Sequence, residues 1–215
     1  MRKVTQQARA WITLHATSTA LALLLLTSAL GTVAGGVELP GLGPVSLPDS
    51  FPLGALLPVV LGVAVGLFCH TTIDGRVVQL APRRHRLVPI HALWVVAGTA
   101  TAALAGAATL ATDVYAAPAV AANVVLFAGL AVLLVIAGRA DQAWLPAAGW
   151  CLISMVFGYR GGSSSDWYGW AFPLDPDVTG VRLIVTGVIW GATALTYSVR
   201  PLFGAQRSDA HSSVS

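Results

Sequence analysis

The amino-acid sequence predicts an all-α, polytopic membrane protein with six transmembrane helices and with both the N- and C-termini in the cytoplasm. Three observations support this fold class. The 215-residue chain is 56% hydrophobic and only 10% charged, whereas a soluble domain carries about 25% charged residues. Six segments are apolar over most of the length that a bilayer requires, about 17–25 residues. Lysine and arginine are also concentrated in alternate connecting segments, as expected when basic loops stay in the cytoplasm.

The first apolar run follows a basic start, "MRKVTQQARAWITLHATSTALALLLLTSALG". A secretory signal peptide has a similar pattern, but its apolar region is only about 7–15 residues long. The run here extends from Trp11 to about Val33, and further apolar runs follow it. We therefore expect a first transmembrane helix at about 11–33 and not a cleaved leader.

Five more helices are expected after a loop rich in glycine and proline, at about 53–69, 88–110, 119–137, 143–157 and 181–199. The fifth is short and has Pro146 near its start, so it is tilted, broken or longer by several residues. Together, residues 1–200 are expected to form a single transmembrane domain. Residues 201–215 are polar and lack periodicity, which predicts a disordered cytoplasmic tail.

The basic residues are distributed unevenly between the two sides of this six-span arrangement. With the N-terminus inside, the outer segments hold only Arg160 and Arg182. The inner segments hold the other ten, namely Arg2, Lys3, Arg9, Arg76, Arg83, Arg84, Arg86, Arg139, Arg200 and Arg207. Retention of lysine and arginine in the cytoplasm therefore fixes the orientation. A five-span arrangement would place the last two arginines outside and weaken the pattern.

The sequence contains no signature of a catalytic, metal or nucleotide site. A nucleophile elbow, a zinc-binding His-Glu-x-x-His pair and a phosphate-binding loop are all missing. We therefore expect no enzyme activity, no catalytic residue, no metal and no cofactor in this chain. The cysteines, Cys69 and Cys151, are interpreted as small hydrophobic residues. The net charge of +3 reflects loop placement in a membrane protein, so we expect no nucleic-acid partner.

Ionisable residues within spans are candidates for function because burying charge in lipid is costly. His15 and His91 lie near the inner ends of two spans and could couple to protons. Asp113 and Arg182 lie near the outer ends of two spans, where they either pair or face water, and we favour water. No acidic residue lies in the middle of a span, which argues against a carrier driven by protons or sodium.

Small residues and aromatic residues form two further patterns. Gly62 and Gly66 lie four residues apart, so they allow close helix packing, either within the monomer or at a dimer interface. The outer segment "DWYGWAFPL" carries four aromatic residues. Because Trp and Tyr prefer the headgroup region, this segment is either an interfacial belt or a re-entrant segment.

The loop between the second and third expected helices has a distinct pattern within "CHTTIDGRVVQLAPRRHRLVPIHALWVV". An acidic residue and a glycine follow the helix, then a semi-apolar stretch, a proline and a basic cluster. This pattern resembles the first cytoplasmic loop of the permease subunits of ATP-binding-cassette exporters, in the six-span group called type-2 permeases. In that family the loop forms a short coupling helix that docks on the ATPase. The residues at the matching positions are Asp74, Gly75, Arg76, Leu80, Pro82, Arg83 and Arg84, with Arg86 in the same basic cluster.

A second resemblance covers the last three expected helices. "NVVLFAGLAVLLVIAGRADQAWLPAAGWCLISMVFG" and "DWYGWAFPLDPD" resemble small permease-type membrane proteins of actinobacteria, and the alanine- and glycine-rich composition agrees with such a source. Together the two resemblances imply a permease subunit in a bacterial inner membrane. A separate ATPase chain would then bind ATP and Mg²⁺, and a second permease chain, identical or different, would complete the transporter.

The substrate class implied by this resemblance is a hydrophobic or amphipathic molecule, such as a drug, a peptide antibiotic or a lipid. The sequence assigns no substrate-binding residues. Two alternatives stay open: a stand-alone membrane protein that binds a partner or confers immunity, and a secondary transporter. The arginines of the loop could also serve only as topological anchors that meet anionic headgroups.

Overall fold

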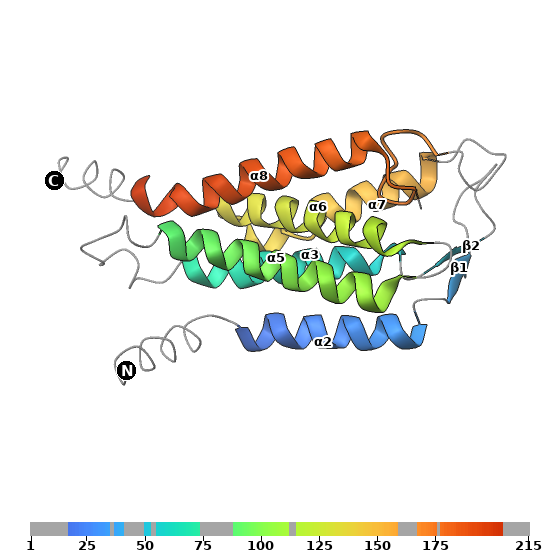
Figure 1. Cartoon of the computed structure of the whole chain (residues 1–215), viewed down its shortest axis with the longest axis horizontal. Coiled ribbons are helices and arrows are strands. Elements are labelled where there is room, and N and C mark those ends of the chain that lie inside the picture. Colours follow the sequence, from blue (N-terminus) through green and yellow to red (C-terminus); the bar gives the residue numbers. More distant parts are fainter. Residues whose placement is uncertain are drawn as a thin grey trace.

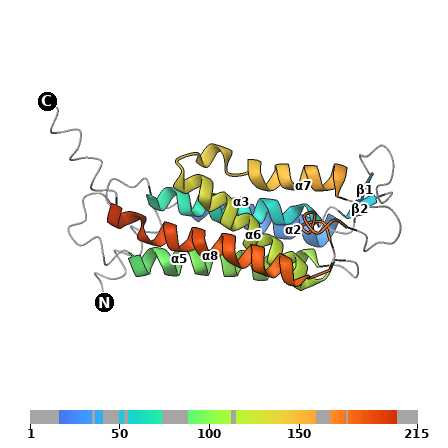
Figure 2. The ribbon, with the colours of Figure 1, turned by 90° about the horizontal axis from the view of Figure 1, so that it is seen from above.

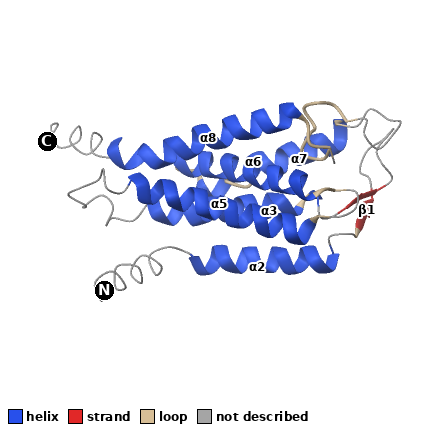
Figure 3. Ribbon diagram, in the orientation of Figure 1, coloured by secondary structure: helices blue, strands red, loops and turns tan. Residues whose placement is uncertain are grey.

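The computed structural model describes residues 17–34, 37–40, 50–52, 55–73, 88–111, 115–158, 167–175 and 177–203. Helices dominate this part of the chain and run roughly along one common direction (Figures 1 and 3). The expectation of an all-α chain is confirmed except for one short pair of strands.

Each of the six segments expected to be helical contains a helix. The helices are α2 (Thr17–Ala34), α3 (Leu57–Ile73), α5 (Val88–Leu110), α6 (Ala117–Ile136), α7 (Leu145–Phe157) and α8 (Gly180–Phe203). The bounds of α5 are those predicted. The start of α3 and the ends of α3 and α8 differ from prediction by four residues, and residues 11–16 of the first segment lie outside the described residues.

The prediction of a disordered tail from residue 201 is wrong at its start, because α8 continues through Pro201 to Phe203. A proline near the end of a helix removes only one late hydrogen bond. Arg200 also donates from Nη1 to the carbonyl oxygen of Val135 at 3.2 Å, which connects this end of α8 to α6. Residues 204–215 lie outside the described residues.

The fifth helix is a short, separate element. Gly138, with φ at +78°, follows the end of α6, as is common after a helix C-terminus. A 3-10 turn, η3 (Ala140–Gln142), then leads to α7, which has a proline in its first turn. With 13 residues at about 1.5 Å per residue, α7 is about 20 Å long. It is therefore shorter than the hydrocarbon layer of about 30 Å.

A small antiparallel ladder interrupts the segment that the sequence predicted only as a loop. Strands β1 (Glu38–Pro40) and β2 (Ser50–Pro52) pair with Leu39 opposite Phe51. The ladder lies beyond the ends of α2 and α3 (Figure 1). Alternating apolar residues in "ELP" and "SFP" are too few to give a strand signal.

Helix α6 lies at the centre of the bundle, where it contacts α3, α5, α7 and α8. Twelve of its twenty residues are buried. Helix α2 packs against α3 and α5, and α7 lies on another side of the bundle (Figure 2). The small residues in "APAVAANVVLFAGLAVLLVI" let several helix backbones approach α6 closely.

The two glycines of α3 face α6. A Cβ atom at Gly62 would lie 2.5 Å from Cβ of Phe127, and one at Gly66 would lie 2.7 Å from Cβ of Ala131. Of the two roles that the sequence left open, these glycines therefore have the first, packing within the monomer. A dimer interface cannot use the same face of α3.

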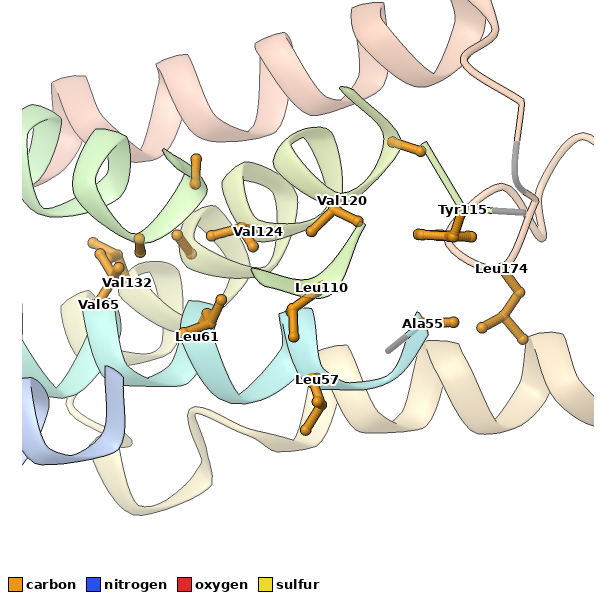
Figure 4. Close-up of a cluster of buried hydrophobic side chains, with 14 of the residues drawn as sticks. Ala55, Leu57, Leu61, Val65, Leu110, Tyr115, Val120, Val124, Val132 and Leu174 are labelled. Atoms are coloured by element: carbon orange, nitrogen blue, oxygen red, sulfur yellow. The ribbon is translucent and has the colours of Figure 1, made fainter. Parts of the chain in front are cut away.

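The core combines apolar and polar side chains, while large apolar side chains cover much of the outside. One buried cluster runs between α3, α5 and α6 from Leu61 and Val124 to Leu110 (Figure 4). Leucine, isoleucine and phenylalanine residues are exposed on α2, α5, α7 and α8. A soluble monomer exposes only limited apolar patches, so this surface suits contact with lipid.

Three described helices are long and apolar enough to cross a membrane: Val88–Leu110, Ala117–Ile136 and Gly180–Arg200. Two shorter apolar helical stretches are Leu21–Val33 and Leu57–His70. Length and composition therefore indicate a membrane protein.

Candidate functional site

The loop that carries the sequence-predicted site joins α3 to α5. Its residues, Asp74, Gly75, Arg76, Leu80, Pro82, Arg83, Arg84 and Arg86, lie outside the described residues. The helix ends on either side of it, Ile73 and Val88, lie at the end of the bundle where α2 begins and α8 ends (Figure 1). We call this the proximal end, and the opposite end the distal end.

An apolar pocket lies between α2, α3 and α5, and we call it the slot. Its volume is about 280 Å³. Its lining residues are Leu21 and Leu24 of α2, Ala64, Val65 and Phe68 of α3, and Trp94, Ala97, Gly98, Thr101 and Ala102 of α5. Apart from the Thr101 hydroxyl and the indole N–H of Trp94, these side chains are hydrocarbon, so the slot suits an uncharged, apolar group.

The slot occupies the proximal part of the bundle. Leu21 lies near the start of α2, Phe68 near the end of α3 and Trp94 near the start of α5. The rings of Phe68 and Trp94 stack with centroids 4.6 Å apart and planes inclined by 14°. Gly98 contributes space, since a Cβ atom there would come no closer than 3.5 Å to the Phe68 ring.

A second feature, at the distal end, was predicted wrongly from the sequence. Arg182 was expected to face water, but its side chain is fully buried, with 0% exposed. Asp113, which was the alternative expected partner of Arg182, lies outside the described residues. The segment that precedes α8 covers Arg182, and only long-range contacts could reveal this.

Four of the five guanidinium N–H groups of Arg182 have acceptors within 3.0 Å. Nη1 donates to the carbonyl oxygens of Asp175 and Asp177, at 2.9 and 3.0 Å. Nη2 donates to the carbonyl oxygen of Ala119 at 2.7 Å and to Oδ1 of Asn123 at 2.8 Å. The Nε–H group has no hydrogen-bond partner among the described residues. Because a guanidinium offers five donors in a fixed fork, this arrangement holds three chain segments together.

Asn123 and Tyr115 extend this network. Asn123 Nδ2 donates to the Tyr115 hydroxyl at 2.7 Å and to the Pro173 carbonyl oxygen at 2.6 Å. The Tyr115 hydroxyl in turn donates to the same carbonyl oxygen. Burial, the larger effect, raises the pKa of Tyr115 to about 12, although the nearby Arg182 lowers it. The hydroxyl therefore keeps the proton that it donates.

Asp175, whose backbone carbonyl oxygen accepts from Arg182, is itself an acidic residue of this network and is only 9% exposed. One carboxylate oxygen accepts the Asp177 backbone N–H at 2.9 Å. Desolvation raises the pKa of Asp175, and the Asp177 charge raises it further. The backbone N–H of Asp177 and the charge of Arg182 lower it, but the net direction is upward.

Other buried polar groups connect helices elsewhere in the bundle. Tyr197 donates from its hydroxyl to the Cys69 carbonyl oxygen at 3.1 Å, and its ring lies 5.6 Å from that of His91. Trp190 donates to the Thr99 hydroxyl at 3.2 Å. His91 is thus packed between helices, and a proton-coupling role for it stays a prediction. His15 lies outside the described residues.

The aromatic residues at 167–172 pack partly against the bundle. Trp150 of α7 donates to the Trp170 carbonyl oxygen at 2.9 Å, and Phe172 is buried against the Trp150 ring at 5.1 Å. Tyr168 and Trp170 are exposed and stack at 6.3 Å. Within the described ranges, no group of three or more His, Cys, Asp or Glu residues could hold a metal ion.

Sequence reasoning missed the residues that surround Arg182. An amide side chain inside the apolar run of α6, Asn123, was the available signal, because a buried polar group requires partners. Tyr115 lies between two helices and gave no comparable signal. Comparison with protein-family models, with curated protein sequences and with solved structures found no match to this chain.

Proposed function

We propose that this chain is a six-span protein of the bacterial cytoplasmic membrane, with both termini in the cytoplasm. The segments attached to the proximal end, with the last turn of α8, contain ten of the twelve lysine and arginine residues. Retention of these residues in the cytoplasm would place the proximal end inside. The short α7 would then cross with help from its flanking residues or from local thinning of the bilayer.

We further propose that it serves as the permease subunit of an ATP-driven exporter. One observation supports this most directly: the loop at residues 74–87 connects the two helices, α3 and α5, that form most of the slot wall. A protein that binds this loop could therefore change the separation of α3 and α5. Such a movement would open or close the slot as a two-state element.

The energy source would be a separate ATPase subunit, which would bind ATP and Mg²⁺. Asp74, Gly75 and Arg76 would begin the docking element, Leu80 and Pro82 would supply its apolar side, and Arg83, Arg84 and Arg86 would supply its basic end. A complete transporter would need a second permease chain, either another copy or a different one. The substrate would be hydrophobic or amphipathic, because the slot offers no charged group.

A secondary carrier is less well supported. Helices α2, α3, α5, α6, α7 and α8 contain no acidic residue, whereas coupling to protons or sodium commonly uses a carboxylate near the middle of a span. Carrier sites also form where helices are broken, and α5, α6 and α8 are continuous.

The test is co-purification from the native membrane in mild detergent. Tagged native protein is compared with a variant in which Arg83, Arg84 and Arg86 are changed to glutamine. The matched control is Arg139→Gln, at an exposed site in another proximal connection. Equal membrane insertion of all three proteins is checked first.

The proposal predicts an ATPase subunit that accompanies the native chain and the control but not the triple variant. If all three proteins retain the ATPase, the exporter proposal stands, but these arginines serve only as topological anchors. If no ATPase accompanies the native chain, the exporter proposal is wrong, and a stand-alone binding or immunity protein becomes the better explanation.

A further inference from the structure

We infer that the slot binds one hydrocarbon tail of a phospholipid from the inner leaflet. This inference rests on the membrane placement of the proposed function and not on the exporter role. Its first support is the lining, which contains no charged side chain. A hydrated or charged ligand would leave its polar groups without partners there, at a cost of several kcal/mol per charged group.

The shape of the slot favours a chain over a compact ring. Its lining on α5 extends from Trp94 to Ala102 along one helix face, a rise of about 12 Å. A volume of about 280 Å³ over that length gives a mean cross-section of about 23 Å². Carbon atoms in contact lie about 3.5–4.0 Å apart, so one extended tail fits but two side by side do not.

The position of the slot identifies the source of the tail. It lies along α5, which is long and apolar enough to cross a membrane, and beside the shorter apolar stretches of α2 and α3. Lipid tails run in the same direction. Leu21, at its rim, is 57% exposed and so faces the region that lipid would occupy. Trp94 lies in the second turn of α5, near the level where tryptophan meets the headgroups.

An apolar occupant also accounts for the small side chains that line the slot. Ala64, Ala97 and Gly98 leave space between three helices that a larger side chain would fill. Elsewhere in the bundle, small residues bring helices into direct contact, as at Gly62 against α6. The same residue type therefore closes one interface and leaves the other open for an apolar occupant.

The experiment uses the full-length protein in nanodiscs that contain a phospholipid with a photoreactive diazirine in one tail. Crosslinked residues are mapped by mass spectrometry. Labelling at the slot residues of α3 and α5 is compared with labelling at Leu183 and Ile184, which are exposed on α8.

The filling variant is Gly98→Leu, with Ala97→Leu as a second variant if the first does not fold. The matched control is Gly187→Leu, where an added Cβ atom meets nothing within 4 Å. Near-UV circular dichroism confirms folding of each variant.

We expect severalfold more labelling in the slot than on the outer face of α8 in the native protein. Filling the slot should reduce that labelling to the level of the outer face, and the control should leave it unchanged. Equal labelling of slot and outer face, or labelling that filling does not reduce, would overturn the inference.

A second probe identifies the source of any apolar occupant. If a tail-free aromatic diazirine labels the slot more strongly than the lipid probe does, the inference of a bound lipid tail is overturned in favour of a ring-shaped ligand. Neither labelling experiment needs an ATPase. The lipid-tail inference can therefore hold even if co-purification shows that the exporter proposal is wrong.

Discussion

Replacing Arg182 by methionine is expected to destabilise the folded bundle by about 4 kcal/mol, because four buried oxygen atoms lose their hydrogen-bond donor. Four guanidinium donors have acceptors at 2.7–3.0 Å, and about 1 kcal/mol for each hydrogen bond gives about 4 kcal/mol. Methionine preserves most of the length of the side chain but leaves the Asn123 amide oxygen and three carbonyl oxygens without this donor.

An opposing effect decides whether the estimate holds. Burying a guanidinium costs several kcal/mol, and replacing a buried ion pair by well-packed apolar residues is sometimes neutral or stabilising. Here only the arginine is replaced, and its acceptors stay buried. An unsatisfied buried polar group costs about 1–3 kcal/mol, so the loss should exceed the relief of desolvation.

The measurement is unfolding by titration with a denaturing detergent in mixed micelles, followed by tryptophan fluorescence. The matched control is Arg200→Met at the other end of α8. Arg200 is half-buried and, among the described residues, makes one hydrogen bond, at 3.2 Å to the Val135 carbonyl oxygen. Its loss should therefore cost about 1 kcal/mol or less. Limited proteolysis should also cut the segment at 167–179 faster in the Arg182→Met protein. A variant as stable as the native chain, or more stable, would refute the reasoning.

Three further predictions use the same unfolding measurement. Tyr115→Phe removes a buried hydroxyl that donates one hydrogen bond and accepts from Asn123 and Arg182, so we expect a loss of about 1–3 kcal/mol; an unchanged free energy of unfolding would contradict this role. Gly62→Ala should cost about 1–3 kcal/mol, because its Cβ atom would meet backbone atoms of α6 within 2.8 Å. The matched Gly187→Ala should be neutral or stabilising by up to about 1 kcal/mol, and equal effects at the two glycines would show that the close contact is not tight. The pKa of Asp175 is raised on folding, so its contribution to stability is greatest below its unfolded pKa and is lost as pH rises through the folded pKa. Asp175→Asn should therefore lessen the loss of stability between acidic and neutral pH, and an identical pH profile in the two proteins would contradict the assignment.

The helices were predictable because each coincides with an apolar run of the sequence, and several of these runs have the length that a bilayer requires. Val88–Leu110 formed with the predicted bounds. The start of α3 was placed four residues too early because the apolar run begins before the helix does. Pro58, in the first turn of α3, gave a better signal, since proline suits the first turn of a helix.

The buried network could not be predicted from local patterns. Arg182 contacts residues 59 to 67 positions away in the chain, and its burial also depends on the carbonyl oxygens of Asp175 and Asp177. Charge at the end of a span normally faces water or headgroups, which made exposure the reasonable expectation. The slot was equally hidden, because it needs three helices to be placed before its lining residues come together.

The most direct test of the central proposal, a six-span membrane protein with its proximal end in the cytoplasm, is labelling of single cysteines in intact bacterial cells. Cys69 and Cys151 are both buried and are replaced by alanine. A cysteine is then placed at Asp141, exposed in the proximal connection before α7, or at Val178, exposed at the distal end before α8. A membrane-impermeant maleimide should label the Val178→Cys protein in intact cells and the Asp141→Cys protein only after permeabilisation. Labelling of both sites from outside, or of the Asp141→Cys site alone, would contradict the proposed topology and with it the cytoplasmic position of the loop at 74–87.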